Sequence, residues 1–294
     1  MLPLSPCRKM KVIISGASGM LGSEIADAFE TDGHEVKRLL GRKELDLTST
    51  ADTLRLIEAY RPDLIIHTAG NKDVDAVERD SRSGYFINTL TTRNMALAAM
   101  KVQAKLLYTS TDAIYNGEKG TAYHEYDEPD PINVYGFSKL KGEEEVRKYC
   151  KKYYIVRLGL LFGNRGHPEN NMIRQIIEKL NQGKTIEASV DQVCSPSYTK
   201  DVTAAILKLC QTDFYGEYNL ANEGQASRYE LTKKICEQMG YDTALVQPAN
   251  AGNIKLARRP KYTAFDSINY KMINAGTMPH WEDALARCLD ELRR

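Results

Sequence analysis

The chain has 294 residues, with 40 basic and 39 acidic side chains, and this length is enough to bury a full hydrophobic core. The balanced charge excludes a global field that would attract nucleic acid or a membrane surface. No apolar run approaches the roughly 20 residues that cross a bilayer. Residues 1–10 contain two prolines and no apolar segment, which predicts a short disordered leader. The six cysteines include no Cys-x-x-Cys pair, so we expect reduced thiols and a cytoplasmic protein.

Apolar runs and helical patterns alternate along the first half of the chain. The expected strands are 11–15, 34–40, 64–68, 105–109 and 154–158. The expected helices are 20–32, 50–60, 83–100 and 135–151, followed after Gly163 by 170–182, 199–211 and 228–240. This alternation predicts an α/β fold with a Rossmann-type doubly wound parallel sheet. We expect a dinucleotide-binding domain over 11–165 and a smaller mixed α/β substrate lobe over 166–294, with some of its segments completing the sheet.

A glycine-rich turn, Gly16-Ala-Ser-Gly19-Met-Leu-Gly22, follows the first strand and opens the first helix. Glycines allow a tight turn and a close approach of the backbone to a pyrophosphate, and the helix N-terminus adds partial positive charge. The spacing differs by one residue from the commonest fingerprint, and a turn that binds nothing is the alternative. In this position, however, the turn predicts a dinucleotide site.

The end of the second strand indicates which dinucleotide is bound. NAD sites usually place an acid there to bond the ribose 2′-hydroxyl, whereas an arginine accommodates a 2′-phosphate. Here Arg42 and Lys43 come first and Glu44 only afterwards. The order favours NADPH, with NADH as the second choice; solvated loop charges are the other interpretation. Asp46 and Leu47 follow the turn and are expected to meet the adenine edge.

Tyr135 and Lys139 lie four residues apart and therefore on one face of a helix. An ammonium beside a phenol is expected to lower the phenol's pKa from about 10 and to make it a proton donor or acceptor near neutral pH. Thr111 ends the fourth strand, where its hydroxyl can bond a carbonyl oxygen that gains charge. Taken singly, these residues also fit a surface helix pair and a helix cap.

Other polar residues give weaker signals. His67 falls within a strand and is expected to be a packed core histidine. The remaining histidines show no metal-ligand spacing, so no metal site is predicted. The acidic loop 125–128 is expected to be a solvated rim.

Three motifs together resemble the extended short-chain dehydrogenases/reductases: Gly16-x-x-Gly19-x-x-Gly22, Ser110-Thr111-Asp112 and Tyr135-x-x-x-Lys139. Within that superfamily, segment 131–143 and Arg258-Arg259-Pro260 are similar to the dTDP-4-dehydrorhamnose reductase branch. The resemblance covers nearly the whole chain from Lys11.

The resemblance implies a role for each matching residue. Tyr135 would protonate the oxygen of a sugar 4-ketone while NADPH delivers hydride, Lys139 would hold the nicotinamide ribose, and Thr111 would orient the carbonyl. The cofactor would contact Gly16, Ser18, Gly19, Met20, Leu21, Gly22, Arg42, Asp46, Leu47, Ala69, Gly70, Asn71, Tyr135 and Lys139. The nucleotide-sugar substrate would contact Thr111, Asp112, Asn171 and Arg258. We expect a monomer or a homodimer that serves polysaccharide biosynthesis.

Two positions depart from the branch. Leu160 stands where a substrate-facing tryptophan is common, and Ala113 replaces the usual tyrosine after Ser-Thr-Asp, so the exact sugar stays open. A sugar-nucleotide epimerase or dehydratase of the same superfamily is an alternative, although a dehydratase needs a carboxylate pair of which Asp112 is only half. A non-catalytic nucleotide-binding subunit, like the beta subunit of methionine adenosyltransferase, is another.

Overall fold

The structure is a computed structural model that describes residues 9–250, 256–273 and 277–293. The leader predicted at residues 1–10 lies almost wholly outside these ranges. Within them, no helix is both long and apolar enough to cross a membrane.

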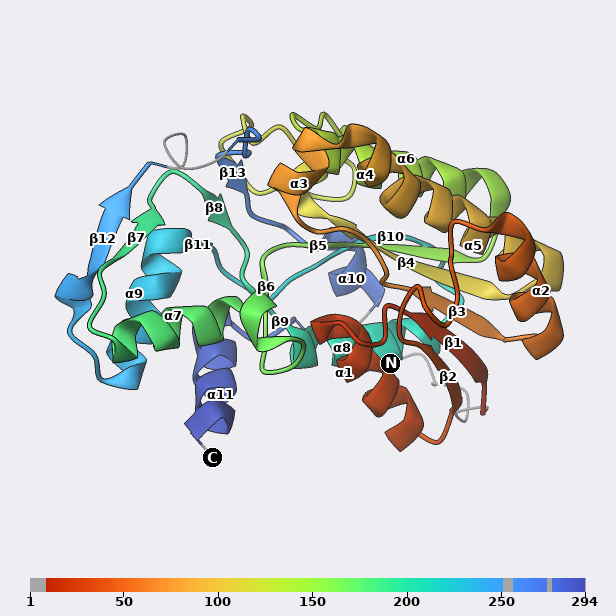
Figure 1. The fold of residues 1–294 in the computed structure, drawn as a ribbon, viewed down its shortest axis with the longest axis horizontal. Helices are drawn as coiled ribbons and strands as arrows, with labels where there is room; N and C mark the ends of the chain where they lie inside the picture. Colours follow the sequence, from red (N-terminus) through yellow and green to blue (C-terminus); the bar gives the residue numbers. More distant parts are fainter. Residues whose placement is uncertain (1–8, 251–255, 274–276, 294) are drawn as a thin grey trace.

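A 6-stranded sheet with the order β10-β5-β4-β3-β1-β2 forms the larger part of the molecule (Figure 1). All of its strand pairs are parallel. The order reverses between β1 and β3, so the chain leaves these two strands toward opposite sides and opens a crevice at their carboxyl ends. The strands are β1 (Lys11–Ser15), β2 (Glu35–Leu39), β3 (Leu64–His67), β4 (Lys105–Thr111), β5 (Tyr153–Leu158) and β10 (Gly216–Leu220).

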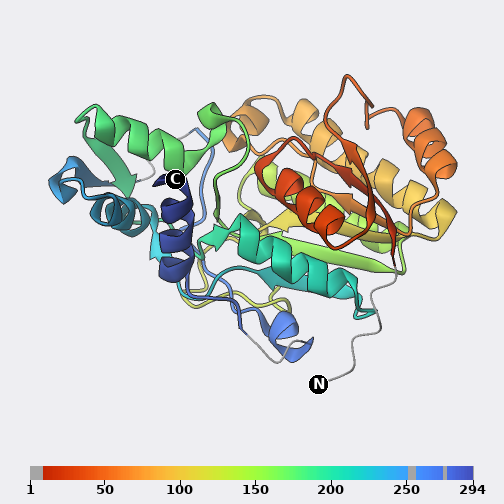
Figure 2. The same ribbon diagram turned by 90° about the horizontal axis from the view of Figure 1, so that it is seen from below.

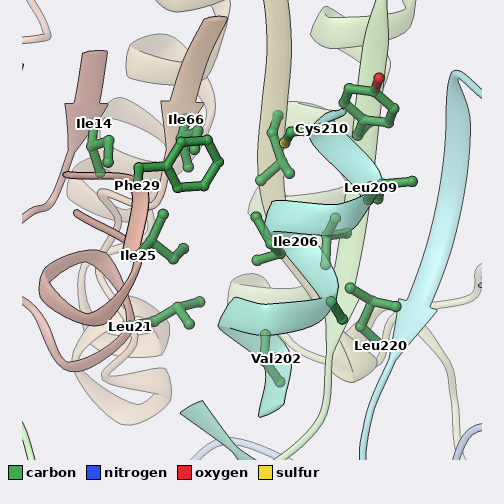
Figure 3. Close-up of a cluster of buried hydrophobic side chains, with 14 of the residues drawn as sticks. Ile14, Leu21, Ile25, Phe29, Ile66, Val202, Ile206, Leu209, Cys210 and Leu220 are labelled. Atoms are coloured by element: carbon green, nitrogen blue, oxygen red, sulfur yellow. The ribbon is translucent and has the colours of Figure 1, made fainter. Parts of the chain in front are cut away.

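Helices cover both faces of this sheet, as the sequence predicts. Side chains alternate along each strand, so that Ile14 of β1 faces one helix layer and Ile13 the other. Figure 3 shows apolar side chains of two helices of the first layer: Phe29 and Ile25 lie beside Ile14 and Ile66, and Ile206 and Leu209 lie farther along the sheet. That layer contains α1 (Met20–Thr31), α8 (Thr199–Cys210) and α10 (Ile268–Ile273); the opposite layer contains α2 (Thr50–Tyr60), α5 (Thr91–Val102) and α6 (Val134–Tyr149). The doubly wound α/β fold is thereby confirmed.

The single helix expected at 83–100 is wrong in its extent. Four helical segments fill this region: α3 (Val74–Arg79), α4 (Ser81–Tyr85), a π-helical turn (Phe86–Leu90) and α5. The helical region starts before residue 83 because Asp73 and Asp80 cap α3 and α4. Each of these side chains accepts a hydrogen bond from the backbone nitrogen three residues ahead. The wider turn contains Asn88, a residue that becomes important at the site.

The smaller lobe lies at the left of Figures 1 and 2. Its core packs Ile173, Leu231, Trp281 and Leu285 together. The chain enters this lobe more than once, because α8, β10 and α10 return to the large sheet; a single boundary at residue 165 stays a prediction. The lobe's helices are α7 (Met172–Asn181), α9 (Arg228–Met239) and α11 (Trp281–Arg293). Its strands are β6 (Leu161–Phe162), β7 (Ile186–Ser189), β8 (Val193–Cys194), β9 (Ser197–Tyr198), β11 (Ala226–Ser227), β12 (Val246–Ala249) and β13 (Tyr262–Thr263). Short 3-10 turns cover Asp112–Ile114, Pro168–Asn170 and Thr243–Leu245.

Candidate active site

The glycine loop closes tightly between β1 and α1. Gly16 has a φ of +72°, and a Cβ atom there would lie 2.8 Å from the backbone nitrogen of Ala69. A Cβ atom on Gly22 would lie 2.2 Å from the carbonyl oxygen of Gly16. Gly19 is the N-cap of α1 and offers no side-chain acceptor, so no capping side chain occupies the amides of the first turn. This arrangement fits the pyrophosphate of a dinucleotide.

A carboxylate lies at the end of β2, although Glu44 follows the two cations in the sequence. Glu44 Oε2 accepts a hydrogen bond from the backbone nitrogen of Leu40 at 2.9 Å, because the turn at Gly41 folds the chain back on the strand. Ser18 holds the same strand end from the glycine loop by donating to the carbonyl oxygen of Leu40 at 2.7 Å. Arg42 and Glu44 therefore both border the expected ribose position, and an acid at this place keeps NADH as the second choice.

The loop after β2 is held mainly by its own residues. Arg42 Nε donates to Asp46 Oδ2 at 2.9 Å, and Asp46 Oδ1 accepts from the backbone and the hydroxyl of Thr48. The hydrogen bonds from Thr48 and Arg42 hold the pKa of Asp46 below its usual value. Asn94 of α5 donates to the carbonyl oxygen of Leu47 at 2.8 Å and ties the loop to the sheet layer. The adenine contacts expected of Asp46 and Leu47 stay predictions.

The Lys139 side chain runs under the carboxyl edge of the sheet and is only 5% exposed. Its Nζ donates to the carbonyl oxygen of Thr109 at 2.7 Å and lies 4.3 Å from the ring centroid of Tyr108. A Cβ atom on Gly70 would lie 3.8 Å from the same Nζ, so the segment after β3 lies close to the ammonium; the cofactor contacts expected of both stay predictions. Burial lowers the pKa of Lys139 to about 7, against the opposing effect of Glu143.

The prediction of an acidified Tyr135 phenol is wrong for this structure. Burial raises the pKa of Tyr135 to about 12, with a hydrogen bond from Thr111 lowering it and the charge of Asp112 raising it. The physical reason is that the phenolate would lose its hydration while the Lys139 ammonium is directed at Thr109. Tyr135 therefore keeps its proton throughout the neutral range, which suits a donor in a reduction.

Thr111 and Asp112, which are predicted site residues, also make hydrogen bonds that stabilise the local fold. The Thr111 hydroxyl caps a short helical turn by accepting from the backbone of Ala113 at 3.2 Å, and it donates to Asp112 Oδ1 at 3.1 Å. Thr263 of the smaller lobe donates to Asp112 Oδ2 at 2.7 Å. Burial raises the pKa of Asp112. The smaller lobe is thus joined by a hydrogen bond to Asp112, the carboxyl group whose charge acts on Tyr135.

The two remaining substrate predictions have different outcomes. Asn171 is buried, its amide donates to the carbonyl oxygens of Gly163 and Arg165, and its oxygen caps α7. The expected substrate contact does not fit this geometry, because the amide protons are already used. Arg258 has an exposed side chain, and its carbonyl oxygen accepts from Asn133 at the N-cap of α6 at 2.9 Å. Its role toward substrate stays a prediction.

Asn88 is a positioning residue that the sequence analysis missed. Its Oδ1 accepts from the backbone of Asn71 at 2.7 Å, and its Nδ2 donates to the carbonyl oxygen of Asn71 at 3.1 Å and to Ser138 Oγ at 2.9 Å. Ser138 in turn donates to the carbonyl oxygen of Tyr135 at 2.8 Å. The segment after β3 and the helix with Tyr135 and Lys139 are therefore fixed to each other. The π turn places Asn88 here, and helical periodicity gives no signal for it.

A buried ion network supports α6 from below. Arg157 of β5, 1% exposed, binds both carboxylate oxygens of Glu143, which is completely buried. Arg147 also binds Glu143, at 2.7 Å. The prediction of a solvated acidic rim at 125–128 is wrong for Glu125, which is 6% exposed and accepts from the backbone of Asn219 at 2.9 Å, whereas Glu128 is exposed as expected. His67 is fully buried with a pKa lowered to about 3 by burial, as expected of a core histidine.

The fold and the placing of the phenol, the amine and the threonine beside a glycine loop define an extended short-chain dehydrogenase/reductase. Comparison with known proteins narrows this class. The model of the family described as "RmlD substrate binding domain" matches residues 10–294, and the chain belongs to that family.

Relatives of the chain agree with this placement over full length. The spore coat polysaccharide biosynthesis protein SpsK of Bacillus subtilis is 30% identical over 283 residues, which cover 96% of this chain and 97% of that protein. The dTDP-4-dehydrorhamnose reductase of Mycobacterium tuberculosis is 29% identical over 289 residues, covering 96% of this chain and 93% of the relative. The crystal structure of the dTDP-4-dehydrorhamnose reductase from Bacillus anthracis in complex with NADP superposes with a TM-score of 0.92 at 34% identity, covering 97% of this chain and 100% of the other. A UDP-glucose 4-epimerase of Thermus thermophilus, at 20% identity, shares the fold.

Proposed function

We infer that this chain is an NADPH-dependent reductase of a nucleotide-activated 4-keto-6-deoxysugar, of the dTDP-4-dehydrorhamnose reductase kind. The observation that carries the inference is the placement of Tyr135 beside Thr111, at the sheet edge where the glycine loop leads into α1. The likeness to reductases along the whole chain supports it. We further propose a cytoplasmic monomer or homodimer that serves polysaccharide biosynthesis.

Each of the three polar groups would have one task in the reduction. The bound dinucleotide supplies the hydride that reaches the carbonyl carbon of the sugar. The Tyr135 hydroxyl donates its proton to the carbonyl oxygen as that oxygen gains charge, and the Thr111 hydroxyl holds the same oxygen by a hydrogen bond. The Lys139 ammonium, held on the carbonyl oxygen of Thr109, would bind the nicotinamide ribose at the same edge. The product is an alcohol, and the phenolate regains its proton from water.

The glycine loop and the lysine edge would hold the dinucleotide. The uncapped amides of the first turn of α1 suit its pyrophosphate, and the residues beside Gly70 and Lys139 suit its nicotinamide ribose. Ala113 and Leu160, both half-buried, would border the sugar in place of larger aromatic side chains. Within the described residues no second carboxylate bonds to Thr111 or Asp112, and this favours reduction over dehydration.

The test is a panel of keto-sugar nucleotides with NADPH and NADH supplied in parallel, followed by the absorbance of the reduced nicotinamide. We expect oxidation with dTDP-4-keto-6-deoxysugars and faster turnover with NADPH. An epimerase would instead keep its cofactor through purification and show no net oxidation. Absence of oxidation with every sugar nucleotide, together with co-purification of a larger enzyme, would support a regulatory subunit and contradict the proposal.

The shifted pKa values of Lys139 and Tyr135 predict how kcat/KM depends on pH. We expect kcat/KM to fall as the pH rises through about 7, because Lys139 loses its proton there, whereas Tyr135, with a pKa of about 12, keeps its own. In Lys139→Arg the side chain stays charged at every accessible pH. When kcat/KM of this variant is plotted against pH relative to its own maximum, the fall near pH 7 should therefore be absent. The same fall in that variant would assign the titration to another group.

A further inference from the structure

Arg228 brings a positive charge from the smaller lobe to the edge of the site. It is the first residue of α9 and is half-buried. It directly follows β11, which pairs with β8, and β8 pairs in turn with β13, the strand of Thr263. The same small sheet therefore carries Arg228 and the threonine that bonds to Asp112. The guanidinium acts on Asp112 and on Cys194, lowering the pKa of each against the larger effect of burial.

Most N–H groups of the Arg228 guanidinium make no hydrogen bond within the part of the chain that the structure describes. Five N–H groups are available on this side chain. Among the residues that the structure describes, it makes one hydrogen bond, from Nη1 to Met172 Sδ at 3.1 Å, and forms no salt bridge. A thioether is a weak acceptor. The nearest acid along the helix, Glu230, is occupied by the backbone and hydroxyl of Ser227 in a capping box. Its remaining N–H groups are therefore available to an anionic ligand, which would bind them more strongly than a thioether does.

We propose that Arg228 binds the phosphate that carries the sugar in the nucleotide diphosphate substrate. This inference rests on the proposed function. In a hexose the reacting C4 and the anomeric carbon lie across the ring from each other, so the sugar-bearing phosphate must lie about one ring width from the groups that hold the carbonyl. Arg228 directly follows β11 of the small sheet that also contains Thr263, the partner of Asp112, so it reaches the site from the lobe opposite Thr111. Its planar fork can bond two phosphate oxygens at once.

The position also links recognition of the phosphate to the contact between the lobes. Thr263 and Arg228 both belong to the smaller lobe, and both act on Asp112. A phosphate held by Arg228 would therefore fix the sugar against the edge that carries Thr111. Removal of the guanidinium should weaken the binding of nucleotides that possess this phosphate and leave other nucleotides unaffected.

The test compares the binding of dTDP and dTMP, because only dTDP has the second phosphate. Isothermal titration calorimetry is carried out on wild type, Arg228→Gln and Lys233→Gln. The last variant is the control, because Lys233 belongs to the same helix and its ammonium lies over the ring of Tyr229. We expect Arg228→Gln to lose about tenfold or more in affinity for dTDP, as the loss of charge-assisted hydrogen bonds implies, with dTMP binding changed less than about twofold. Lys233→Gln should match wild type for both nucleotides.

Two results would overturn the inference: wild-type affinity of Arg228→Gln for dTDP, or an equal loss for dTDP and dTMP. NADPH binding, measured on every variant, verifies an intact fold. If Arg228→Gln does not fold, Arg228→Lys keeps the charge without the fork and should lose affinity for dTDP only. The assay of turnover in wild type is separate, so failure to oxidise NADPH contradicts the proposed function, whereas unchanged dTDP binding contradicts only the role of Arg228.

Discussion

Replacement of Tyr135 by phenylalanine should reduce kcat by about 10²- to 10⁴-fold, the contribution of a positioned general acid. The expected cause is loss of the proton that the carbonyl oxygen takes up, since the ring itself is retained. The KM for NADPH should stay near its wild-type value, because the glycine loop and Lys139 are untouched. Stopped-flow absorbance with saturating NADPH and keto-sugar separates this chemical step from cofactor binding.

A matched control is Tyr126→Phe, which removes an equivalent hydroxyl from a side chain that is 70% exposed. This variant should keep wild-type kcat. If Tyr135→Phe retained more than about a tenth of wild-type kcat, the phenol would not be the proton donor, and a group such as Asp112, whose pKa is raised by burial, would have to be considered.

Replacement of Arg157 by methionine should lower the free energy of unfolding by about 3 kcal/mol or more, the usual effect of breaking a buried ion pair from one side. The reason is that Glu143 is completely buried, and burial alone penalises its charged form while the arginines hold its pKa below the usual value. Urea unfolding at pH 7 measures the change. The helix that carries Tyr135 and Lys139 rests on this network, so activity should also fall.

Two further variants separate the network from general effects of charge. Arg293→Met removes one partner of an exposed pair with Asp290 and should cost less than about 1 kcal/mol. The double variant Arg157→Met with Glu143→Leu removes both buried charges and should be more stable than Arg157→Met alone. Equal stability of Arg157→Met and Arg293→Met would show that the buried pair contributes little.

Strong periodicity explains what the sequence predicts well. The strands of the large sheet up to β5, and α1, α2, α6 and α8, occur within a few residues of their predicted ends, because their apolar spacing reflects burial on a known face. Two-residue strands such as β8 have no periodicity to detect. The broken helix at 74–102 depends on the caps Asp73 and Asp80 and on a π turn, and α11 was not predicted although its apolar positions form one buried face.

At the site, the sequence locates residues but not their environments. It predicts roles for the glycine loop, Thr111, Tyr135 and Lys139, since motif and spacing carry that information. The raised pKa of Tyr135 depends on burial and on the direction of the Lys139 side chain, neither of which a spacing of four residues contains. Glu44 reaches β2 only because the turn folds back. Asn88 reaches Asn71 and Ser138 across long sequence separations, about which local patterns carry no information.

The transfer of deuterium tests the central claim most directly. The protein is incubated with dTDP-4-keto-6-deoxysugar and NADPH that carries deuterium on the reactive face of the nicotinamide ring, and the sugar product is analysed by NMR. The account predicts a deoxysugar alcohol with deuterium at C4 in amounts equal to the NADP⁺ formed. Unlabelled sugar, or turnover without net formation of NADP⁺, would contradict reduction at this site.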